Sequence, residues 1–519
     1  MIHISHQHKA VVVPYRPDLA NLFPHAKRID YEGEEMIVLP HGLDETRLLR
    51  NLDMNVPAPI VEHYEFPGDK RPFDKQVATC ALMTMHPRAF VLNKMGTGKT
   101  KSCLWSFDWL KRTRKAKKML VVAPLSTIDF VWGQEIMKTL PGCKYQILYG
   151  SAEKRLDNLN KEADVYIVNH DGLKVKPLFN RLMQRHDIDV ICFDEAAVFR
   201  NARTEMAKAA QALTRGRTWV WAMTGSPTPT APTDAFGLLK VIMPEKCPRS
   251  FVHFRQETML QVSQFKWVPR SDAATTVSKM LQPSVCFSLD DVTELPPLVE
   301  RMIPVQQGKR QRDAYKDMAD KASVQLKEGR ITAQNGGIAL NKLLQISAGY
   351  VYDDNGHAIS LDNEHRTQTM LDLIESTDRK VIVFSAYKHL QKGIKEALDR
   401  HHIHNALVNG DVGHAARQEI FNAFQNTDKY DVLNAHPECM AHGLTLTAAD
   451  TIIWFGPLPS LEIYEQANAR IRRVGQTAKQ QVCKLHGTPA ERVMYARLDQ
   501  RRNVQESILD LLAEITKEK

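Results

Sequence analysis

The chain has 519 residues, 43% of them hydrophobic, which is more than one hydrophobic core usually holds, so we expect two or three globular domains. Its 69 lysines and arginines outnumber its 60 aspartates and glutamates, a mild positive balance that suits a polyanionic partner without requiring one. No run of roughly eighteen or more apolar residues occurs, and the opening MIHISHQHKAVVV has neither the basic start nor the cleavage site of a signal peptide. We therefore expect neither membrane insertion nor secretion.

Eight cysteines are scattered along the chain without a CxxC pair. This spacing argues against a zinc site and against a disulfide framework. It is typical of a protein that works in a reducing cytoplasm.

Residues 1–60 predict a small α+β module. Short apolar runs at Lys9–Val13 and Glu35–Leu39 alternate with Pro and Gly, and the helical pattern LDETRLLRNL follows them. Residues 61–244 then predict a parallel sheet flanked by helices, because strand-like runs alternate with amphipathic stretches. The strands expected there are Ala89–Leu92, Met119–Val122, Val165–Val168, Val190–Phe193 and Thr218–Met223.

The first of these strands runs into NKMGTGKT and a helical pattern follows, which is the context of a phosphate-binding loop. Gly96 and Gly98 would let backbone N–H groups turn toward phosphate oxygens. Lys99 would neutralise the β- and γ-phosphates, and the hydroxyl of Thr100 would hold Mg²⁺. The strict pattern has Gly where Asn93 stands, so a glycine turn without a nucleotide is the alternative. The residues assigned to ATP in this loop are Met95, Gly96, Thr97, Gly98, Lys99 and Thr100.

The strand Val190–Phe193 ends at two carboxylates, Asp194 and Glu195. Ligands of α/β sheets bind at the carboxyl ends of the strands, so Asp194 would position Mg²⁺ there and Glu195 would polarise the attacking water. Taken alone, the pair could equally be an ordinary helix start. After the next strand comes MTGSPTP, for which a plain turn is the alternative to a functional loop.

Residues 245–295 are mixed in character and predict an insertion or linker. Residues 296–490 predict a second parallel-sheet lobe, and residues 491–519 predict a helical brace. The strands expected in the second lobe are Lys380–Phe384, Asn405–Val408, Tyr430–Leu433 and Thr451–Phe455.

The stretch QANARIRRVGQ follows the last of these strands, and we expect a helix from about Ser460 through its arginines. Positions three apart share a helix face, so Arg470 and Arg473 would point together while Arg472 points roughly 100° away. Two guanidinium forks aimed at one place indicate a phosphate target. A solvated basic turn is the alternative.

These motifs together resemble the helicase-superfamily-two ATPases of the Snf type, which are double-stranded-DNA translocases, and they resemble the compact bacterial and bacteriophage branch in particular. The resemblance covers roughly residues 70–500. The motifs that carry it, in chain order, are MGTGKT, VVAPLSTIDFVWGQE, DEAA, MTGSPTP, KVIVFSAY, GLTLTAADTIIWF and QANARIRRVGQ.

The resemblance implies roles for further residues. Gln76 falls where the family contacts adenine, and Thr224 and Ser226 lie where it couples hydrolysis to lobe movement. Arg470 and Arg473 fall on its arginine fingers, in the motif that Gln466 opens, and Gly443 matches a loop that touches nucleotide and DNA. The positions that the resemblance places on the DNA backbone are Ser126 in Ser126–Trp132, Asn169 in Asn169–Leu173, and Arg417.

Each of these DNA positions also has an ordinary interpretation, as a helix start or an exposed charge. The family usually has His where Ala197 stands and Asn where Thr445 stands, so the coupling of ATP turnover to DNA could be altered. SLDDVTELPP replaces the family's arginine-rich approach to the second lobe. The N-terminal segment is similar to the HepA-related module of annealing helicases, with a generic docking module as the alternative.

Two other charged tracts have weaker functional interpretations. KRTRKAKK, Lys111–Lys118, could hold phosphate by its charge, but we favour a solvated loop. RHHIH, Arg400–His404, lies between an expected helix and an expected strand, and we do not expect it to bind metal.

We therefore predict an α/β protein with two tandem RecA-like lobes behind a small N-terminal α+β module. It would be an ATP- and Mg²⁺-dependent motor on double-stranded or branched DNA, acting in fork remodelling, annealing or protein displacement, as in DNA repair. We expect a monomer in the cytoplasm of a bacterium or a phage-infected host, with DNA-processing proteins as further partners. The alternatives are a strand-separating DNA or RNA helicase and an ATP-gated nucleic-acid-binding protein that does not translocate.

Overall fold

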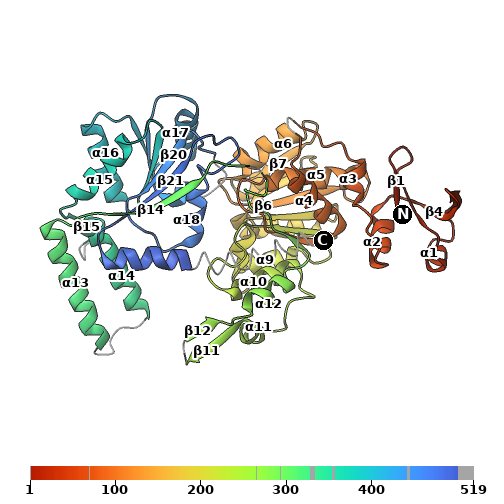
Figure 1. Ribbon diagram of the computed structural model, residues 1–519, viewed down its shortest axis with the longest axis horizontal. Helices are drawn as coiled ribbons and strands as arrows, with labels where there is room; N and C mark the ends of the chain where they lie inside the picture. Colours follow the sequence, from red (N-terminus) through yellow and green to blue (C-terminus); the bar gives the residue numbers. More distant parts are fainter. Residues whose placement is uncertain are drawn as a thin grey trace. The chain divides into compact units, whose positions relative to one another are not determined.

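The computed structural model describes residues 2–68, 71–264, 266–292, 294–327, 333–352, 357–440 and 445–500. The described residues form two compact units, one up to Val292 and the other over residues 294–500 (Figure 1). Each unit contains its own parallel sheet, which confirms the predicted α/β class with two RecA-like lobes.

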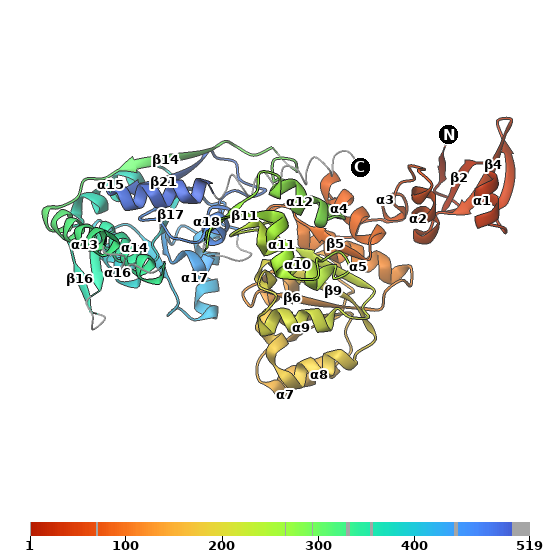
Figure 2. The ribbon, with the colours of Figure 1, turned by 90° about the horizontal axis from the view of Figure 1, so that it is seen from below.

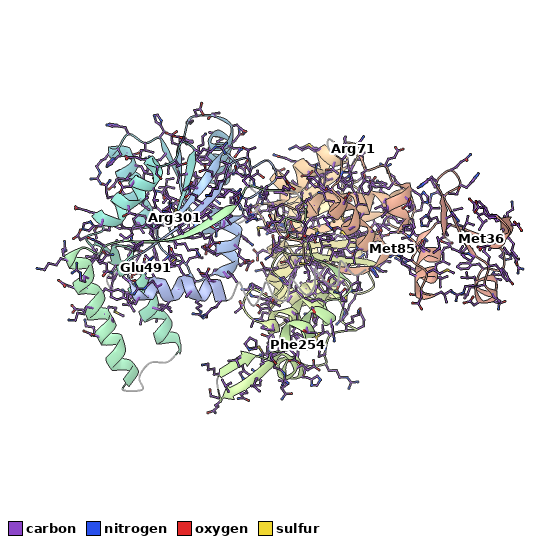
Figure 3. All side chains as sticks on the ribbon, viewed as in Figure 1. Met36, Arg71, Met85, Phe254, Arg301 and Glu491 are labelled. Carbon is purple, nitrogen blue, oxygen red and sulfur yellow. The ribbon has the colours of Figure 1, made fainter. Side chains whose placement is uncertain are left out.

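The first unit begins with an antiparallel four-stranded sheet of order β1-β2-β4-β3. Val11, Val13 and Leu49 are fully buried in its small core, in agreement with the alternating apolar pattern. Arg47 of the second helix donates from Nε to the carbonyl of Met85 at 2.8 Å and so joins this module to the larger domain (Met85 is labelled in Figure 3). The elements are β1 His3–Ser5, β2 Ala10–Pro14, α1 Pro17–Leu22, β3 Lys27–Tyr31, β4 Glu34–Pro40 and α2 Leu43–Asn51.

The main body of the first unit is a seven-stranded parallel sheet of order β13-β5-β10-β9-β6-β8-β7. Two separate hydrophobic clusters pack around this sheet and its helices. The strands are β5 Arg88–Val91, β6 Lys118–Ala123, β7 Tyr145–Leu148, β8 Val165–Asn169, β9 Ile188–Asp194, β10 Trp219–Met223 and β13 Ser284–Val285. The helices around it are α3 Pro59–His63, α4 Asp74–Met85, α5 Lys99–Arg112, η1 Ile128–Gly133, α6 Gln134–Thr139, α7 Ala152–Asn160, η2 His170–Lys174, α8 Lys176–Gln184, η3 Ala196–Phe199, α9 Glu205–Leu213, η4 Pro232–Asp234 and α10 Ala235–Ile242.

The five strands predicted for this lobe are confirmed to within a few residues, while β7 and β13 were not predicted. The mixed segment that follows α10 forms a helical pair and a two-stranded hairpin (Figure 1; the two helices are also labelled in Figure 2). Its elements are α11 Phe251–Thr258, β11 Met259–Ser263, β12 Lys266–Pro269 and α12 Ala273–Met280. The chain then returns to the large sheet as β13, beside β5.

The second unit holds a six-stranded parallel sheet of order β14-β21-β20-β17-β19-β18. The strands are β14 Leu298–Pro304, β17 Lys380–Phe384, β18 Asn405–Val408, β19 Val432–Ala435, β20 Ala449–Trp454 and β21 Gln480–His486, with a small hairpin of β15 Tyr350–Tyr352 and β16 Ala358–Ser360. The helices are α13 Lys309–Lys327, α14 Ala333–Ser347, α15 Glu364–Glu375, α16 Lys388–Arg400, α17 His414–Asn426, η5 Pro437–Met440 and α18 Leu461–Asn468.

The four strands predicted for the second lobe are present, two of them with the predicted bounds, and β14 and β21 were not predicted. Residues 489–500 are helical, and residues 501–519 of the predicted brace lie outside the described residues. Glu491, labelled in Figure 3, forms a buried ion pair with Arg366 of α15 at 2.8 Å and so attaches this helix to the sheet domain. None of the helices in the described ranges combines the length and apolar character needed to cross a membrane.

Candidate nucleotide-binding site

Three loops of the first unit leave the large sheet at the same edge. Strand β10 lies between β5 and β9, and its last residue, Met223, pairs with both Val91 and Asp194. The phosphate loop, the TGS loop and the Asp-Glu pair therefore start from one row of residues. The pairing thus brings the phosphate loop next to two segments that lie more than a hundred residues further along the chain. All three lie at the carboxyl ends of the strands, where parallel sheets bind ligands.

The phosphate loop has the backbone that phosphate binding requires. Gly96 and Gly98 both have φ of +80°, in the left-handed region that glycine adopts most readily. A Cβ on Gly98 would lie 1.9 Å from Nε2 of Gln76, so a side chain at this position would displace the Gln76 amide. Helix α5 begins directly afterwards at Lys99, and the dipole at its N-terminus favours an anion there.

The side chains of the loop are directed back onto its own carbonyl groups. Lys99 donates from Nζ to the carbonyl oxygens of Asn93, at 2.8 Å, and Lys94, at 3.4 Å. The hydroxyl of Thr97 also donates to the carbonyl of Lys94, at 2.8 Å. Gln76 is buried and accepts the backbone N–H of Phe73 at 3.0 Å, which fixes its amide beside Gly98. The ammonium group is thus held within the loop that the sequence assigns to phosphate.

Asn93, which departs from the strict loop pattern, has a structural role. It is 3% exposed, and its Nδ2 donates to the hydroxyl of Thr79 in α4 at 3.0 Å. Its Oδ1 accepts the backbone N–H of Phe287 at 3.0 Å. A glycine could make neither bond. The amide therefore joins the phosphate loop to α4 and to the segment after β13.

Asp194 is buried, and both of its carboxylate oxygens accept hydrogen bonds. The indole Nε1 of Trp132 donates to Oδ2 at 2.9 Å, and the backbone N–H of Glu195 donates to Oδ1 at 3.1 Å. Glu195 has φ of +49°, a left-handed conformation that is uncommon for a residue with a side chain and that occurs often at functional sites. This conformation turns the chain sharply between the strand and η3.

His170 also contacts this turn; it lies in the Asn169–Leu173 segment that the resemblance places on the DNA backbone, and no role near Asp194 was predicted for it. Its Nε2 lies 2.8 Å from the carbonyl oxygen of Asp194, and because a carbonyl only accepts, Nε2 must carry the proton. Burial lowers the pKa of His170, so the ring is held neutral. His170 and Trp132 both act across long sequence separations, and no local pattern announces such contacts.

The TGS loop lies against the phosphate loop. The backbone N–H of Thr224 donates to the carbonyl of Val91 at 3.0 Å, and the Thr224 hydroxyl accepts the N–H of Ser226 at 3.1 Å. A Cβ on Gly225 would lie 3.7 Å from Cα of Lys94. Thr224 and Ser226 are both buried. The structure therefore brings the two predicted coupling residues next to the predicted nucleotide loop.

In the second unit, the predicted helix through the arginines is wrong. Helix α18 ends at Asn468, and Arg470 and Arg473 lie in the turn that follows. Arg470 donates from Nε to the carbonyl of Gln466 at 2.8 Å, and Arg473 donates from Nε to the carbonyl of Ala469 at 3.2 Å. These bonds satisfy carbonyl groups that the end of a helix leaves without partners, which stabilises the stop.

Two further contacts hold this turn. Gln476, buried at the end of the motif, donates from Nε2 to the carbonyls of Ala449 at 2.9 Å and Ile471 at 3.1 Å. Arg473 donates from Nη1 to the hydroxyl of Thr445 at 3.4 Å. The residue that replaces the family's Asn is thus a partner of a predicted arginine finger. Gly443, which the sequence assigns to nucleotide and DNA, lies outside the described residues.

The three predicted DNA-binding residues have different environments. Asn169 is buried, and its Oδ1 accepts a hydrogen bond from Arg155 at 3.1 Å. Arg417 donates from Nη2 to the carbonyls of Asn409 and Val412 at 3.1 and 3.0 Å. The hydroxyl of Ser126 is buried and has no hydrogen-bond partner among the described residues.

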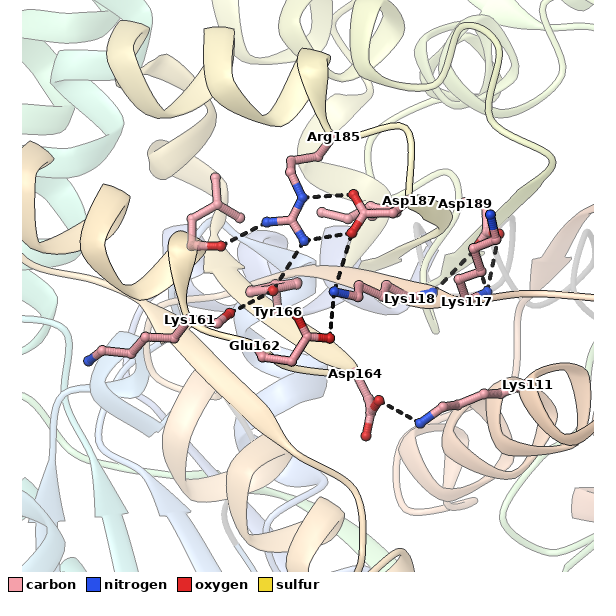
Figure 4. A network of polar contacts seen from close by, with 12 residues as sticks. Lys111, Lys117, Lys118, Lys161, Glu162, Asp164, Tyr166, Arg185, Asp187 and Asp189 are labelled. Atoms are coloured by element: carbon pink, nitrogen blue, oxygen red, sulfur yellow. Dashed lines mark hydrogen bonds and ion pairs between the residues drawn. The ribbon is translucent and has the colours of Figure 1, made fainter. Parts of the chain in front are cut away.

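The basic tract before β6 forms ion pairs with carboxylates that precede β8 and β9. These lie at the amino ends of the strands, at the other end of the sheet from the candidate nucleotide site (Figure 4). Lys111 pairs with Asp164 at 2.5 Å, and Lys118 pairs with Glu162 at 2.9 Å and with Asp187 at 3.3 Å. The positive charge of these lysines is therefore compensated within the protein. This arrangement favours the predicted ordinary interpretation over a phosphate site.

Comparison with known proteins places these features in a family. Residues 80–348 match the model of the SNF2-related domain, and residues 365–475 match the helicase conserved C-terminal domain. Protein p41 of Acyrthosiphon pisum secondary endosymbiont phage 1 is 27% identical, over 83% of this chain and 95% of its own length. The SWI/SNF-related matrix-associated actin-dependent regulator of chromatin subfamily A-like protein 1 of Xenopus laevis is 23% identical, over 79% of this chain and 41% of its own length.

Two further similarities concern a cellular helicase and a solved structure. An uncharacterized ATP-dependent helicase of Mycoplasma pneumoniae is 21% identical, over 80% of this chain and 40% of its own length. This chain thus spans about two fifths of these two cellular relatives and nearly all of the phage protein. The Sulfolobus solfataricus SWI2/SNF2 ATPase core in complex with dsDNA has 20% sequence identity and a TM-score of 0.42, covering 88% of this chain and 97% of that one.

A parallel-sheet unit with a phosphate loop and an Asp-Glu pair at one edge, followed by a second parallel-sheet unit, defines the class of the helicase-like ATPases. The SNF2-related domain alone accounts for more than half of the chain. The protein belongs to the SNF2-related family, which confirms the resemblance inferred from its motifs.

Proposed function

We propose that the protein hydrolyses ATP with Mg²⁺ and uses the energy to move along double-stranded or branched DNA. The observation that carries this proposal is the shared sheet edge at Val91, Met223 and Asp194. The loops that follow β5 and β10 and the Asp-Glu pair after β9 start from this one row of residues, which supports their assignment to a common ATPase site. Family membership supports the same activity.

The residues at this edge fit a magnesium-bound nucleotide. A hydroxyl from Thr100, in the first turn of α5, and a carboxylate from Asp194 are the oxygen ligands that Mg²⁺ prefers. The two N–H groups that donate to Asp194 fix the orientation of its carboxylate. Mg²⁺ bound there would neutralise charge that develops on the phosphate oxygens.

Each remaining residue of the first unit has a distinct role in this proposal. Lys99 would leave its present carbonyl partners and bind the β- and γ-phosphates. The backbone N–H groups of the loop between Met95 and Thr100 would bind the same phosphates. Glu195 would polarise the attacking water, and Gln76 would contact adenine beside Gly98. Thr224 and Ser226 would report hydrolysis to the second unit.

In the second unit, we assign Arg470 and Arg473 to the γ-phosphate, where a planar fork can stabilise transition-state charge. Gln466 and Gly443 complete the assigned nucleotide residues. Gln466 is buried, and its carbonyl holds the guanidinium of Arg470. The backbone of this motif thus sets the position of the fork.

DNA is the proposed track. The net charge of +9 suits a polyphosphate, and the relatives include a regulator of chromatin and ATP-dependent helicases. The turn at Ser126, the segment at Asn169 and the loop at Arg417 are the assigned contacts with the phosphate backbone. All eight cysteines are free thiols, which supports a reducing cytoplasm as the place of action.

The test is ATP turnover with duplex, single-stranded and forked DNA and with RNA, at two salt concentrations, together with triplex displacement. We expect duplex or forked DNA to stimulate turnover most, and we expect Lys99→Ala and Glu195→Gln to abolish it while DNA binding remains. Lys111→Ala, in the last turn of the same helix, is the matched control and should retain turnover. Turnover that survives Lys99→Ala or Glu195→Gln would refute the site.

The same measurements separate the proposal from its two alternatives. Preferential stimulation by single-stranded DNA or RNA would favour a strand-separating helicase. Binding of ATP and DNA without multiple turnover would favour an ATP-gated binding protein. Displacement of a triplex strand requires stepping and would exclude that last alternative.

A further inference from the structure

The carboxylate of Asp194 is held by a tryptophan that the family motifs do not assign to the nucleotide. Trp132 is fully buried, and its Nε1 donates to Asp194 Oδ2 at 2.9 Å. The indole has one donor and no acceptor, so this bond is the entire polar interaction of the ring. The two residues are 62 positions apart in sequence.

Two other buried indoles of the first unit donate to backbone carbonyls. Trp105 donates to the carbonyl of Pro67 at 2.8 Å, and Trp219 donates to the carbonyl of Lys115 at 3.3 Å. These backbone partners are what a tryptophan with only a packing role needs. Trp132 instead donates to the side chain that we assign to Mg²⁺, so a change in its position would change the orientation of that carboxylate.

Trp132 stands at the end of an unusual turn of helix. Residues Ile128–Gly133 form a π-helix, in which the N–H of Trp132 donates to the carbonyl of Thr127 at 3.0 Å. Such wide turns are rare and occur often at functional sites, because they are less stable than the α-helix. The hydroxyl of Thr127 donates in turn to the carbonyl of Pro124 at 2.9 Å. The backbone of Trp132 is therefore linked by short hydrogen bonds to the turn that contains Ser126.

The same segment is braced against the helix of the phosphate loop. Glu135 in α6 pairs with Lys101 of α5 at 3.5 Å. A Cβ on Gly133 would lie 3.2 Å from both the Asp129 carboxylate and the Tyr145 hydroxyl, so the end of the π-helix has little free space. A displacement of the turn at residues 124–127 would thus be transmitted along the π-helix rather than absorbed beside it.

We infer that Trp132 is a positioning residue that transmits DNA contact at residues 124–127 to the Mg²⁺-binding carboxylate of Asp194. The inference rests on the proposed function, since it requires both a DNA-binding turn and a nucleotide site. DNA on the turn sets the position of the indole, and the N–H sets the angle at which Asp194 presents its oxygens. Removing a residue that hydrogen-bonds to a metal ligand typically lowers the affinity for the metal by about 10–100-fold.

The test compares Trp132→Phe with Trp105→Phe, a matched loss of an indole N–H from a buried tryptophan in the same unit. A fluorescent ATP analogue is titrated with Mg²⁺ in the presence and absence of duplex DNA, so that the readout is binding and not turnover. In the wild type and in Trp105→Phe, DNA should lower the Mg²⁺ concentration for half-saturation. In Trp132→Phe that concentration should rise by about tenfold or more and should no longer respond to DNA, while DNA affinity stays within about twofold of the wild type.

A DNA-dependent shift in Trp132→Phe equal to that of the wild type would overturn the inference. If Trp132→Phe does not fold, benzothienylalanine at position 132 keeps the shape of the ring, replaces its N–H by sulfur, and is judged by the same two outcomes. A wild-type protein that binds the analogue but shows no effect of DNA would overturn the inference alone. A wild-type protein that binds neither the analogue nor DNA would overturn the proposed function as well.

Discussion

The side-chain oxygen of Asn93 accepts the backbone N–H of Phe287 at 3.0 Å, and this bond joins two segments that are 194 positions apart. It continues a row of backbone bonds in which Leu92 donates to Val285 and Lys94 donates to Phe287, each at 2.8 Å. The segment before the second unit is therefore bound along β5 as far as the phosphate loop. The asparagine that stands in place of the usual glycine thus adds a hydrogen bond between the phosphate loop and this segment.

Replacing Asn93 by Gly should destabilise the first unit although it restores the usual loop pattern. Phe287 is 3% exposed, so its N–H would lose its partner away from water, at a cost of about 1–3 kcal/mol. The expected results are a lower unfolding temperature and faster hydrogen exchange of the Phe287 amide. Asn93→Asp keeps the acceptor and should retain most of the protection at Phe287. Unchanged exchange in Asn93→Gly would show that the bond contributes nothing.

Replacing Arg473 by Lys should abolish DNA-stimulated hydrolysis although the charge is kept. The guanidinium uses Nε for the carbonyl of Ala469 and Nη1 for the hydroxyl of Thr445, which fixes the plane of the fork. A lysine cannot reproduce that plane, and the loss of an arginine finger lowers turnover by about 10³-fold or more. Single-turnover hydrolysis and nucleotide binding measured side by side would show a lost chemical step with binding retained.

Arg472→Lys, in the same turn, is the matched control and should keep turnover within about twofold, since the assigned role belongs to its neighbours. The reverse pattern, with Arg472→Lys inactive and Arg473→Lys active, would move the finger to the other arginine. The two substitutions change the same chemical group by the same amount. The comparison therefore isolates position from charge.

Much of the fold could be predicted from the sequence because buried parallel strands are continuous apolar runs. Lys380–Phe384 and Asn405–Val408 were predicted with the bounds that the structure shows. Strand β13 is only two residues long, and its partner β5 lies far away in sequence, so no local pattern distinguishes it. Strand β21 contains Gln480 and Lys484, which are buried polar residues that hide its strand character.

The geometry of the candidate site could be predicted where its residues lie in one loop, but not where side chains distant in sequence meet. Gly98 and Lys99 follow from the local pattern, and the structure gives them the expected backbone. The helix through Arg470 was wrong because helix propensity does not reveal that an arginine will take the carbonyl of Gln466 and stop the helix. The bond from Trp132 to Asp194 joins η1 to the end of β9, which the folded sheet brings together, and no local sequence pattern reveals it.

Replacing Asp187 by Asn should destabilise the protein near neutral pH and have less effect in acid. Two hydrogen bonds from Arg185, at 2.7 and 2.8 Å, hold the pKa of Asp187 well below its usual range. A carboxylate whose folded pKa is lowered stabilises the fold above its unfolded pKa, near about 3.9, and loses that effect as the pH falls toward the folded value. Unfolding temperatures from pH 7 to pH 3 should therefore converge for the variant and the wild type. Glu162→Gln is the exposed control on Lys118 and should change little at any pH.

The N-terminal module should detach more readily below about pH 6.5, because His41 of the module and its partner His63 at the end of α3 are both held neutral. His41 donates from Nε2 to the carbonyl of Pro57 at 2.9 Å, so its Nδ1 accepts from Nε2 of His63, also at 2.9 Å. Burial is the main cause that lowers the pKa of both rings; His6 and Lys9 oppose a charge on His63, and Glu62 favours one. Below the histidine pKa of the unfolded chain, the unfolded module binds protons that the folded module cannot bind. The free energy of unfolding of the module is therefore constant above that pH and decreases below it.

Hydrogen exchange of the β2 and β4 amides at pH 7.5 and pH 5.5 measures this loss directly. We expect faster exchange at pH 5.5 in the wild type and a smaller difference in His63→Gln, since an amide can still donate to Nδ1 of His41 but does not titrate near neutral pH. His25→Gln removes an exposed histidine of the same module and should leave the pH dependence as it is. An unchanged pH dependence in His63→Gln would assign the effect to another group, because the pair would then carry no part of the proton uptake.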